Sequence, residues 1–396
     1  MTRSTTLPVA DAAVVRLLRD RDVCPIYQPI VDLTTGDVVG VEALARGPAG
    51  SDLHMPAQLF AAAAAAGLLP EIDQLCATRA LEQARDAAAT PPLVFINAEP
   101  AVLDRPLTPE LIAVINSGLP FKIVLEFTER ALARQPARML QVADVTRSWG
   151  NRIALDDVGV EPASLAFMPL VAPDVVKLDM SLLRSPHRPD TVDTAAAVAG
   201  YAHRVGATVI AEGIETEADR ATAAALGANW GQGWLFGRPG PLDALDAGRF
   251  AAAVDLHTAE PAAGAFPVTH TGDADTVDDL WQALLRRVRR WHTPASVLCA
   301  GRDTTTLTRW AAALGGVDLA FRGVAGALPA AVPGVRVCRP DLVTTDDDAL
   351  TAVAVTAHSA VVLRARPGPD GAFDITFTDD MTLAVQLARA LLNAFV

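Results

Sequence analysis

The sequence predicts an α/β protein in which a parallel sheet or barrel is followed by a smaller α/β unit. From about residue 22 to 249, short apolar runs rich in β-branched residues alternate with longer alanine-rich stretches, a rhythm typical of parallel strands joined by helices. Residues 251–275 are rich in Pro, Gly, Ala and Thr without a sustained period, which indicates a linker. We therefore expect an N-terminal extension, a barrel domain, a linker and a second domain over residues 1–21, 22–250, 251–275 and 276–396.

Eight short apolar runs are the strands that we expect in the first domain. In chain order they cover residues 25–30, 38–44, 93–96, 123–127, 152–155, 175–178, 208–211 and 233–236. The clearest helices between them span residues 56–65, 71–89, 136–149 and 191–205. This alternation favours parallel pairing, because parallel strands need a long crossover, usually a helix, between them.

The second domain is predicted to begin with an amphipathic helix over residues 277–291 and to end with a helix over residues 382–394. Between them, the predicted strands are residues 295–300, 353–355, 360–364 and 373–377, and residues 321–323 are expected to form a turn. The first helix carries Arg286, Arg287, Arg289 and Arg290. Such a run is typical of a solvated helix face.

The chain has 396 residues and a net charge of −13, with 33 Lys and Arg against 46 Asp and Glu. A protein that binds long DNA or RNA through its phosphates needs a basic face, so this balance argues against such a partner. No apolar run is long enough to span a membrane, and the N-terminus lacks the apolar core of a signal peptide. The four cysteines have no paired spacing, which fits a reducing compartment, and we expect a cytoplasmic protein.

Carboxylate and amide side chains occur at the carboxyl ends of successive predicted strands. They are Glu42, Asn97, Glu126, the adjacent pair Asp156 and Asp157, and Glu212. In a parallel barrel these ends meet on one face, where such folds build active sites. So many negative charges in a small volume need a cation, and oxygen ligands without His or Cys suit Mg²⁺ or Mn²⁺. The adjacent pair can bridge two ions, an arrangement that serves in-line phosphoester hydrolysis.

Lys177 is one of only two lysines, and it lies within an apolar strand with Asp179 two residues further on. A lysine beside such a site can orient a water, accept its proton or neutralise the charge of the reacting phosphate. Each residue taken singly also has a plain structural explanation. Strand-end carboxylates cap helices and start turns, and a lysine can reach solvent from an edge strand. Their joint occurrence favours a functional site.

The order of these motifs resembles that of the EAL family of cyclic-di-GMP phosphodiesterases. The signature itself, E-A-L-A-R, begins at Glu42. The other matching segments are Y-Q-P-I with Gln28, F-I-N-A-E-P with Asn97, E-F-T-E from Glu126 to Glu129, D-D at Asp156, K-L-D at Lys177, A-E-G-I-E with Glu212, and Q-G at Gln232. The resemblance covers residues 25–241, and so many motifs in one order are specific, whereas the three letters E-A-L alone would not be.

The resemblance implies a TIM-type barrel with one antiparallel strand, two Mg²⁺ or Mn²⁺ ions and hydrolysis of cyclic-di-GMP to linear pGpG. It implies that Glu42, Asn97, Glu126 and Asp156 hold one metal and that Asp156, Asp157 and Glu212 hold the other. The catalytic residues would be Lys177, Glu212, Asp157 and Glu42. It gives substrate contacts to Gln28, Arg46 and Gln232, and supporting roles to Glu129, Asp179 and Glu215. A homodimer is the expected assembly.

The loop after the acidic pair departs from the family pattern. The family commonly has D-D-F-G-T-G, whereas this chain has D-D-V-G-V-E-P from Asp156 to Pro162. The change removes a hydroxyl and a glycine close to the metal ligands, while Pro162 adds rigidity. It keeps a second hypothesis open, in which the barrel is a catalytically weak or silent receptor for cyclic-di-GMP or a protein partner.

The second domain lacks a metal-ligand cluster, a nucleophile triad and a glycine-rich phosphate loop in its sequence. Residues 296–301, 321–323 and 378–380 resemble segments of the DICT sensory domain found beside cyclic-di-GMP enzymes. This resemblance implies a regulatory unit that senses a signal or a signalling partner and biases the barrel through a shared interface. In the barrel, Trp230 and Trp234 are candidates for stacking on guanine, and packing against the barrel end is the alternative.

Overall fold

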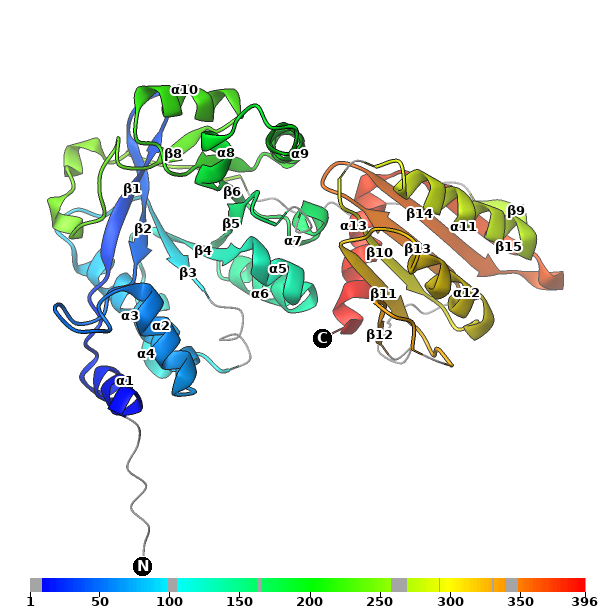
Figure 1. Cartoon of the computed structure of the whole chain (residues 1–396), viewed down its shortest axis with the longest axis horizontal. Coiled ribbons are helices and arrows are strands. Elements are labelled where there is room, and N and C mark those ends of the chain that lie inside the picture. The colour runs from blue at the N-terminus through cyan, green and yellow to red at the C-terminus, as the bar shows by residue number, and fades with distance from the viewer. Residues whose placement is uncertain are drawn as a thin grey trace, which may run out of the picture.

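The computed structural model describes residues 9–98, 105–161, 165–257, 269–291, 293–329, 331–338 and 348–395. It contains a closed eight-stranded barrel surrounded by helices and a smaller domain built on a seven-stranded sheet (Figure 1). The predicted fold class, a TIM-type barrel followed by a smaller α/β domain, is confirmed. None of the described helices is both long enough and apolar enough to cross a membrane.

The eight barrel strands lie side by side in chain order, and β1 closes the ring against β8. Their bounds are β1 (Ile26–Asp32), β2 (Val38–Leu44), β3 (Leu93–Asn97), β4 (Lys122–Thr128), β5 (Arg152–Val158), β6 (Val175–Leu178), β7 (Thr208–Ala211) and β8 (Trp230–Gln232). β1 is antiparallel to both neighbours, and the other pairs are parallel. The one antiparallel strand is therefore β1, because a short turn and not a helix joins it to β2.

The eighth strand lies earlier in the chain than residues 233–236, so that prediction was wrong. Gly233, which follows β8, packs against the backbone of Ile214, and a Cβ at this position would lie 2.0 Å from the Ile214 carbonyl oxygen. The amides of Leu235 and Phe236 donate to the carbonyls of Ile214 and Gly233, so these residues turn instead of extending. The apolar residues give the stronger strand signal, but this close backbone contact decides where the strand ends.

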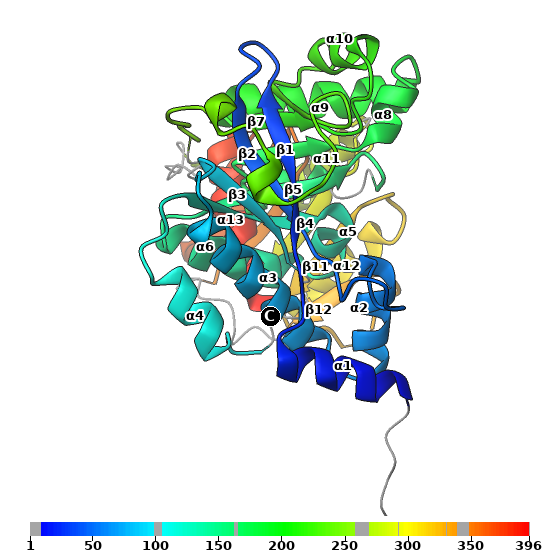
Figure 2. The same ribbon diagram turned by 90° about the vertical axis from the view of Figure 1, so that its left-hand side faces the viewer.

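Helices cover the outside of the barrel, and a proline in the first turn marks where several begin. The longer ones are α2 (Pro56–Ala65), α3 (Leu69–Asp86), α6 (Pro136–Ser148), α9 (Pro189–Val205) and α10 (Glu217–Ala225). The shorter ones are α4 (Pro109–Ile115), α5 (Glu129–Arg134), α7 (Met168–Val171) and α8 (Met180–Arg184). Before the barrel, α1 (Val9–Asp20) packs against α2 and α3 (Figure 2).

Apolar side chains fill the barrel interior away from the strand ends that carry the acidic residues. Val124, Val175 and Ile210 belong to this cluster together with Trp230. The segment that follows the barrel joins it, since Ala251, Val254 and Leu256 pack on the same cluster. Leu256 is only 3% exposed, and its carbonyl oxygen lies 3.4 Å from two nitrogens of the Arg152 guanidinium. The first residues of the predicted linker therefore form the floor of the barrel.

The second domain is a mixed sheet with the strand order β12-β11-β10-β13-β14-β15-β9. Its strands are β9 (His270–Gly272), β10 (Ser296–Ala300), β11 (Phe321–Ala325), β12 (Arg336–Cys338), β13 (Leu350–Val355), β14 (Ala360–Pro367) and β15 (Phe373–Thr378). α11 (Ala274–Val288) and α12 (Thr304–Leu314) cover one face, where the rings of Trp281 and Trp310 stack at 4.7 Å. α13 (Met381–Leu392) packs on the other face.

The prediction of a turn at residues 321–323 was wrong, because these residues begin β11, which pairs in parallel with β10. Gly323 suggests a turn in the sequence, yet a Cβ there would lie within 3 Å of the Phe321, Leu298 and Phe395 side chains. The glycine thus serves close packing on the sheet. The four predicted strands and both predicted helices are present, and the sequence does not predict α12, β9 or β12.

The two domains share one hydrophobic cluster, because α13 packs against α6 and α7 of the barrel as well as against its own sheet. Figure 1 shows α13 between the second sheet and the barrel. The rings of Phe167 and Phe321 meet edge to face across this interface, with centroids 5.6 Å apart. Arg204 of α9 donates a hydrogen bond to the carbonyl of Ala357 at 2.7 Å. The second domain is therefore attached to helices that flank β5 and β6.

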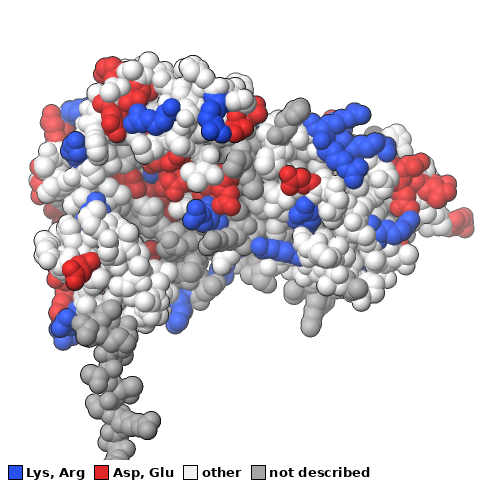
Figure 3. All heavy atoms as spheres, viewed as in Figure 1, with Lys and Arg blue, Asp and Glu red and all other residues white. Residues whose placement is uncertain are grey.

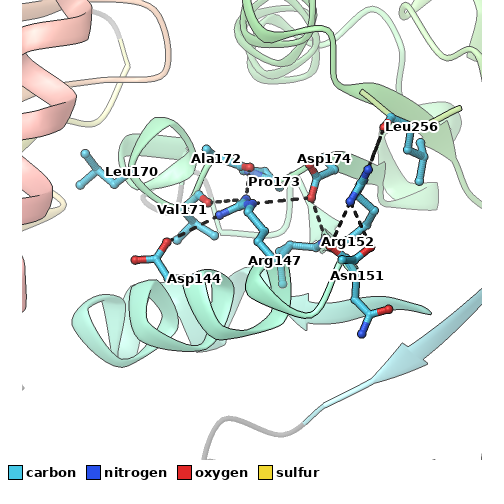
Figure 4. A network of polar contacts seen from close by, with 12 residues as sticks. Asp144, Arg147, Asn151, Arg152, Leu170, Val171, Ala172, Pro173, Asp174 and Leu256 are labelled. Carbon is cyan, nitrogen blue, oxygen red and sulfur yellow. Dashed lines mark hydrogen bonds and ion pairs between the residues drawn. The ribbon is translucent and has the colours of Figure 1, made fainter. Parts of the chain in front are cut away.

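Arginine side chains extend this contact toward the barrel strands (Figure 4). Arg389 of α13 donates to the carbonyl of Leu170 and to the carboxylate of Asp144 in α6. One turn further along α6, Arg147 donates to the carbonyl of Val171 at 2.9 Å and lies 3.9 Å from buried Asp174. Asp174 in turn accepts the amide of Ile153 at 2.9 Å. This chain of contacts links the second domain to the starts of β5 and β6.

Candidate metal and phosphodiester site

The carboxyl ends of the barrel strands bring six polar side chains together. They are Glu42 of β2, Asn97 of β3, Glu126 of β4, Asp156 and Asp157 of β5, and Glu212 directly after β7. In the strand register Asn97 lies opposite Glu126, whereas Asp156 lies opposite Thr128, two residues beyond Glu126, and the tilt of barrel strands brings such staggered positions to one end of the barrel. In Figure 3, acidic side chains gather across the middle of the barrel. The structure thus brings together the residues that the sequence predicted to converge.

The carboxylates form two groups that share one residue. Oxygens of Glu42, Glu126 and Asp156 lie within 4.8 Å of one another, and so do oxygens of Asp156, Asp157 and Glu212. Asn97 belongs to the first group through its side-chain amide, which donates to Glu42 Oε1 at 2.8 Å. Asp156 is therefore in position to bridge two cations, one in each group.

Lys177 lies between the two groups and is fully buried. Its Nζ lies 2.8 Å from Glu212 Oε1, 3.0 Å from Glu126 Oε1, 3.1 Å from Asp156 Oδ1 and 3.5 Å from Glu42 Oε2. Burial alone would lower the pKa of Lys177, but the surrounding carboxylates raise it well above its usual value. The ammonium is thus held in its charged form, and it does not reach solvent from an edge strand.

The carboxyl groups around Lys177 differ in the direction in which their pKa values are shifted. Burial raises the pKa of Glu126 and raises that of Glu212 to about 8, and neighbouring carboxylates add to both shifts against the opposing effect of Lys177. Burial would also raise the pKa of Glu42, but Lys177 and the hydrogen bonds from Gln232 and Asn97 hold it below its usual value. Burial and the neighbouring Asp156 and Asp179 raise the pKa of Asp157. A cation would lower the raised pKa values.

The donor set fits divalent metal ions. The oxygens of buried Glu126 and Asp156 Oδ1 accept no hydrogen bond of ordinary geometry, although the Lys177 ammonium lies 3.0 Å from Glu126 Oε1 and 3.1 Å from Asp156 Oδ1. Buried polar oxygens without a hydrogen bond are costly, so these atoms are suited to coordinating a cation. All the donors are oxygens, as Mg²⁺ and Mn²⁺ prefer. Asp157 adopts a left-handed conformation with φ of 58°, a conformation that is rare for a residue with a side chain and common at functional sites.

The predicted substrate residues lie on β1, on β8 and after β2. Gln28 faces Glu42 in the strand register, and Gln232 donates to Glu42 Oε2 at 2.7 Å and to Gln28 Oε1 at 3.2 Å. Arg46 is half-buried and donates to the carbonyl of Ala45. Beside them, a cavity of about 330 Å³ is lined by residues that include Glu42, Leu44 and Asn97. Gln232 therefore joins Gln28 to Glu42, one of the grouped carboxylates, while Arg46 lies two residues beyond the end of β2.

The supporting residues fall into two sets. Glu129 is buried and its Oε2 accepts the amides of Gly159 at 3.1 Å and Glu161 at 2.7 Å, so it holds the loop after the acidic pair. Asp179 caps α8 by accepting the amide of Ser181. Glu215 is exposed and forms an ion pair with Arg184 at 3.2 Å, so the structure places it outside the carboxylate groups. Pro162 of the altered loop lies outside the described residues.

The two tryptophans have different environments. Trp230 is buried in the cluster that fills the barrel. It therefore packs within the barrel, which was the alternative to stacking on guanine. Trp234 is 53% exposed, and the guanidinium of Arg238 lies 3.9 Å from its ring centroid. Sequence reasoning missed Arg238, although the R-P-G that contains it lies only four residues after Trp234. A cation stacked on one face leaves the other face of the indole for a planar ligand.

Comparison with known proteins gives similarity over the barrel part of the chain. A family model described as EAL domain matches residues 11–239. A probable cyclic di-GMP phosphodiesterase PdeB of Escherichia coli K12 is 32% identical over 233 residues, which cover 57% of this chain and 44% of the relative. An uncharacterized signaling protein of Caulobacter vibrioides is 32% identical over 234 residues, 58% of this chain and 29% of the relative. The chain therefore spans less than half the length of these relatives.

A solved structure described as the PaMucR phosphodiesterase in complex with c-di-GMP has 25% sequence identity and a TM-score of 0.51. The match covers 59% of this chain and 99% of that one. The fold is a closed barrel with one antiparallel strand, and acidic side chains gather at the carboxyl ends of its strands. These two features define the class of protein to which this chain belongs. The chain belongs to the EAL domain family, because the family model matches more than half of its length.

Proposed function

We propose that this chain is a metal-dependent phosphodiesterase that hydrolyses cyclic-di-GMP to linear pGpG and that its second domain regulates the reaction. The observation that carries this proposal is Asp156, which belongs to two carboxylate groups at once. A bridging carboxylate is typical of sites that hold two metals for in-line phosphoester hydrolysis. The substrate named for PdeB and the c-di-GMP bound to PaMucR support the choice of phosphodiester.

Two Mg²⁺ or Mn²⁺ ions are the proposed cofactors, held by the residues of the two groups. Glu42, Asn97, Glu126 and Asp156 would hold one ion, and Asp156, Asp157 and Glu212 the other. When bound, the ions supply an activated water and neutralise charge on the reacting phosphate. Lys177, as a buried ammonium, would orient that water or donate a hydrogen bond to a phosphate oxygen.

The remaining site residues would bind and position the dinucleotide. Gln232 donates through its amide to Glu42 and to Gln28, so these two glutamines would fix the edge of the substrate next to the first ion. Arg46 carries a positive charge at the end of β2, where it would face a phosphate that is not being cleaved. Glu129 would act through the loop that it anchors, because its hydrogen bonds keep Gly159 and Glu161 beside Asp157.

A silent receptor is the competing function, and the altered loop after Asp157 is the observation in its favour. The position of Lys177 favours the enzyme. A receptor that only binds a dinucleotide has no need for a fully buried lysine that contacts four carboxylates. Glu129 also retains its hydrogen bonds to the loop in spite of the changed loop sequence.

The test is incubation of the full chain with cyclic-di-GMP and Mg²⁺ or Mn²⁺, followed by chromatography of the products. We expect pGpG to accumulate, and we expect calcium to inhibit because its larger, looser coordination misplaces the attacking water. If binding of cyclic-di-GMP persists and no pGpG forms with either metal, the receptor hypothesis is correct. Full activity in calcium alone would contradict the two-metal arrangement.

The proposed assembly is a homodimer, and the proposed division of the chain is a barrel followed by a regulatory domain that resembles DICT domains. Sedimentation of the full chain at micromolar concentration tests the first. Limited proteolysis tests the second, since a division of the chain into a barrel and a second domain should give two stable fragments of the corresponding sizes. A signalling partner would act through the second domain, because α13 of that domain contacts the helices beside β5 and β6.

A further inference from the structure

Asp174 joins the starts of three barrel strands, at the end of the barrel opposite the grouped carboxylates. It is fully buried, and its carboxylate accepts the amide of Ile153 in β5 at 2.9 Å. Its own amide donates to the Ile153 carbonyl at 2.9 Å, and its carbonyl accepts the amide of Thr208 in β7 at 3.0 Å. Asp156 lies three residues beyond Ile153 on β5. Lys177 lies likewise three residues beyond Asp174 on β6, so Asp174 bears on the placement of both strands at the metal site.

Arg147 of α6 holds the turn that leads into Asp174. Its guanidinium donates to the carbonyl of Val171 at 2.9 Å and to that of Ala172, at the end of α7. Ala172 has a left-handed conformation with φ of 52°, which is uncommon for a residue with a side chain, so this turn depends on contacts from its surroundings. The Arg147 side chain is only 11% exposed, and its Nε lies 3.9 Å from Asp174 Oδ2. Arg147 therefore fixes where β6 begins.

Asp144 competes with Asp174 for the same guanidinium. It lies one turn before Arg147 on α6, and its Oδ1 is 4.0 Å from Arg147 Nη1, close to the 3.9 Å between Nε and Asp174. Figure 4 shows the Arg147 side chain between the two carboxylates. Among the described residues neither Nε nor Nη1 finds a hydrogen-bond acceptor. Attraction between charges thus acts on Arg147 from both sides, and no hydrogen bond to either carboxylate fixes it.

Arg389 of the second domain decides this competition in the structure. It pairs with the same Oδ1 of Asp144 at 2.5 Å and so compensates the charge that attracts Arg147 from that side. Burial lowers the pKa of Arg147, Asp174 opposes this shift, and the positive charge of Arg389 adds to it. The two guanidinium groups are therefore close enough to repel each other. Arg389 favours the contact of Arg147 with Asp174 both by pairing with Asp144 and by this repulsion.

We infer that Arg147 is a positioning residue, which through the starts of β5 and β6 sets the place of the grouped carboxylates and of the buried lysine. Arg389 keeps it in place by occupying Asp144. When the second domain moves away, Asp144 draws Arg147 off Asp174, and the turn 171–174 loosens. A signal that detaches the second domain thereby lowers turnover. The effect on turnover rests on the proposed phosphodiesterase, whereas the change of partner by Arg147 does not.

The experiment is a double-mutant cycle on the full chain, read by pGpG formation and by hydrogen exchange in β5 and β6. Arg389→Ala should lower kcat about threefold with little change in KM and should speed exchange in both strands. Asp144→Asn keeps an acceptor for Arg389 and loses the charge, so it should behave as the unmodified chain. The double variant should recover most of the lost kcat and of the exchange protection, because no charge then draws Arg147 away. A merely structural loss would add up instead.

Two further variants separate this relay from general loosening of the interface. Arg204→Ala is the matched control, because Arg204 crosses the same interface and donates to the Ala357 carbonyl instead of to Asp144. Adding Asp144→Asn should not restore this control. Arg147→Met should lower kcat at least as much as Arg389→Ala, and Asp144→Asn should not restore it either. If Arg147→Met does not fold, as judged by its thermal transition, the double variant decides alone.

The proposal is overturned if the double variant is as impaired as Arg389→Ala or more so, or if Asp144→Asn restores Arg204→Ala equally. In both cases Arg389 acts only by holding the domains together. If the unmodified chain forms no pGpG, the proposed function fails and the exchange rates decide. Protection of β5 and β6 that returns in the double variant then retains the relay, and protection that stays lost refutes it.

Discussion

Lys177 takes the place of a cation among carboxylates that would otherwise repel one another. Four carboxylates lie within 3.5 Å of its Nζ, so the acidic site is compensated before any metal binds. Removing one partner of a buried charge network leaves the others uncompensated, which typically costs several kcal/mol. The lysine therefore contributes to the stability of the metal-free site as well as to the proposed chemistry.

Replacing Lys177 with Met should destabilise the metal-free protein by about 3–5 kcal/mol, because the methionine removes the charge and keeps the chain length. Urea unfolding with and without Mn²⁺ measures this. The loss should be smaller in Mn²⁺, since bound metal would supply the missing positive charge. The same loss with and without metal would contradict a shared role of ammonium and metal.

Replacing Glu42 with Ala should abolish pGpG formation, because Glu42 is a proposed metal ligand and accepts hydrogen bonds from Asn97 and Gln232. Glu215→Ala is the matched control, since Glu215 belongs to the same resemblance but is exposed and paired with Arg184. We expect the control to keep most of its activity in a product assay. Undiminished hydrolysis by Glu42→Ala would refute the metal assignment.

Metal affinity should rise with pH between about 6.5 and 8.5. The pKa of Glu212 in the metal-free protein is raised to about 8, so the group holds a proton at neutral pH that metal binding has to displace. Titration calorimetry with Mn²⁺ in two buffers would show the released proton. The same shift should make the metal-free protein less stable as pH rises from 4.5 toward 8, because the folded state holds the proton more tightly than the unfolded state.

The sequence predicted which side chains lie close together, because their positions depend on strand ends. Glu42, Asn97, Glu126, Asp156 and Glu212 each follow an apolar run, and parallel strands bring such ends together. Glu215 was expected to support the carboxylate groups, but it lies in the turn after β7, where it forms an ion pair with Arg184 at the surface. A side chain beyond the strand end is positioned by contacts that no local pattern encodes.

The loop between β5 and α7 is the element on which catalysis should depend most. Asp157, near the end of β5, adopts a left-handed conformation, and after the strand Gly159, with φ of 115°, lies against Leu182. Glu129 fixes both Gly159 and Glu161 through one carboxylate oxygen. Glu129 thus holds the backbone of this loop through two hydrogen bonds.

Replacing Glu129 with Ala should lower kcat about tenfold and change the affinity for cyclic-di-GMP little. Hydrogen bonds to a charged acceptor contribute about 1.5–3 kcal/mol, and their loss frees the loop next to Asp157. The control is Arg130→Ala, because Arg130 and Glu161 form only an exposed contact at 3.9 Å. Steady-state kinetics and nucleotide titration of both variants separate the two effects. Equal losses in both variants would contradict the anchoring role.

Elements with a strong internal period were predictable, and those defined by backbone contacts were not. The strands 38–44, 175–178 and 208–211 have the bounds that the sequence gives, since all are apolar runs in the barrel. β8 was predicted too late in the chain, and the start of β11 was predicted as a turn. Gly233 after β8 and Gly323 in the middle of β11 suggest turns in the sequence, but in the structure they allow close packing. The edge strands β9 and β12 are too short to give a pattern.

At the scale of the whole molecule, the second domain is part of the barrel's outer layer. α13 contacts both α6 and α7, and Arg389 and Arg147 continue this contact to Asp174 before β6. Figure 3 shows Arg side chains gathered on the second domain, near the place where Figure 1 labels α11. The interface was not predictable from the sequence, because it does not depend on local periodicity, whereas the run of arginines at the end of α11 is visible in the sequence.

Replacing Arg389 with Ala should uncouple the two domains. We expect faster hydrogen exchange in α6 and α7 and a change in turnover of at least twofold, since Asp144 and the Leu170 carbonyl lose their partner. Arg287→Ala is the control, because Arg287 pairs with Asp379 at an exposed site within the second domain. Mass spectrometry and kinetics measure both variants. Unchanged exchange in α6 and α7 would contradict coupling through this contact.

The residues that close the floor of the barrel limit where the coding sequence can be cut or joined to that of another domain. Ala251, Val254 and Leu256 close the barrel and at the same time begin the path to the second domain. A chain cut at residue 250 would leave Trp230 and its neighbours open to water, so the shorter protein should aggregate. Replacement of the second domain by another domain is therefore tolerable only at junctions after residue 257, where the barrel is already closed.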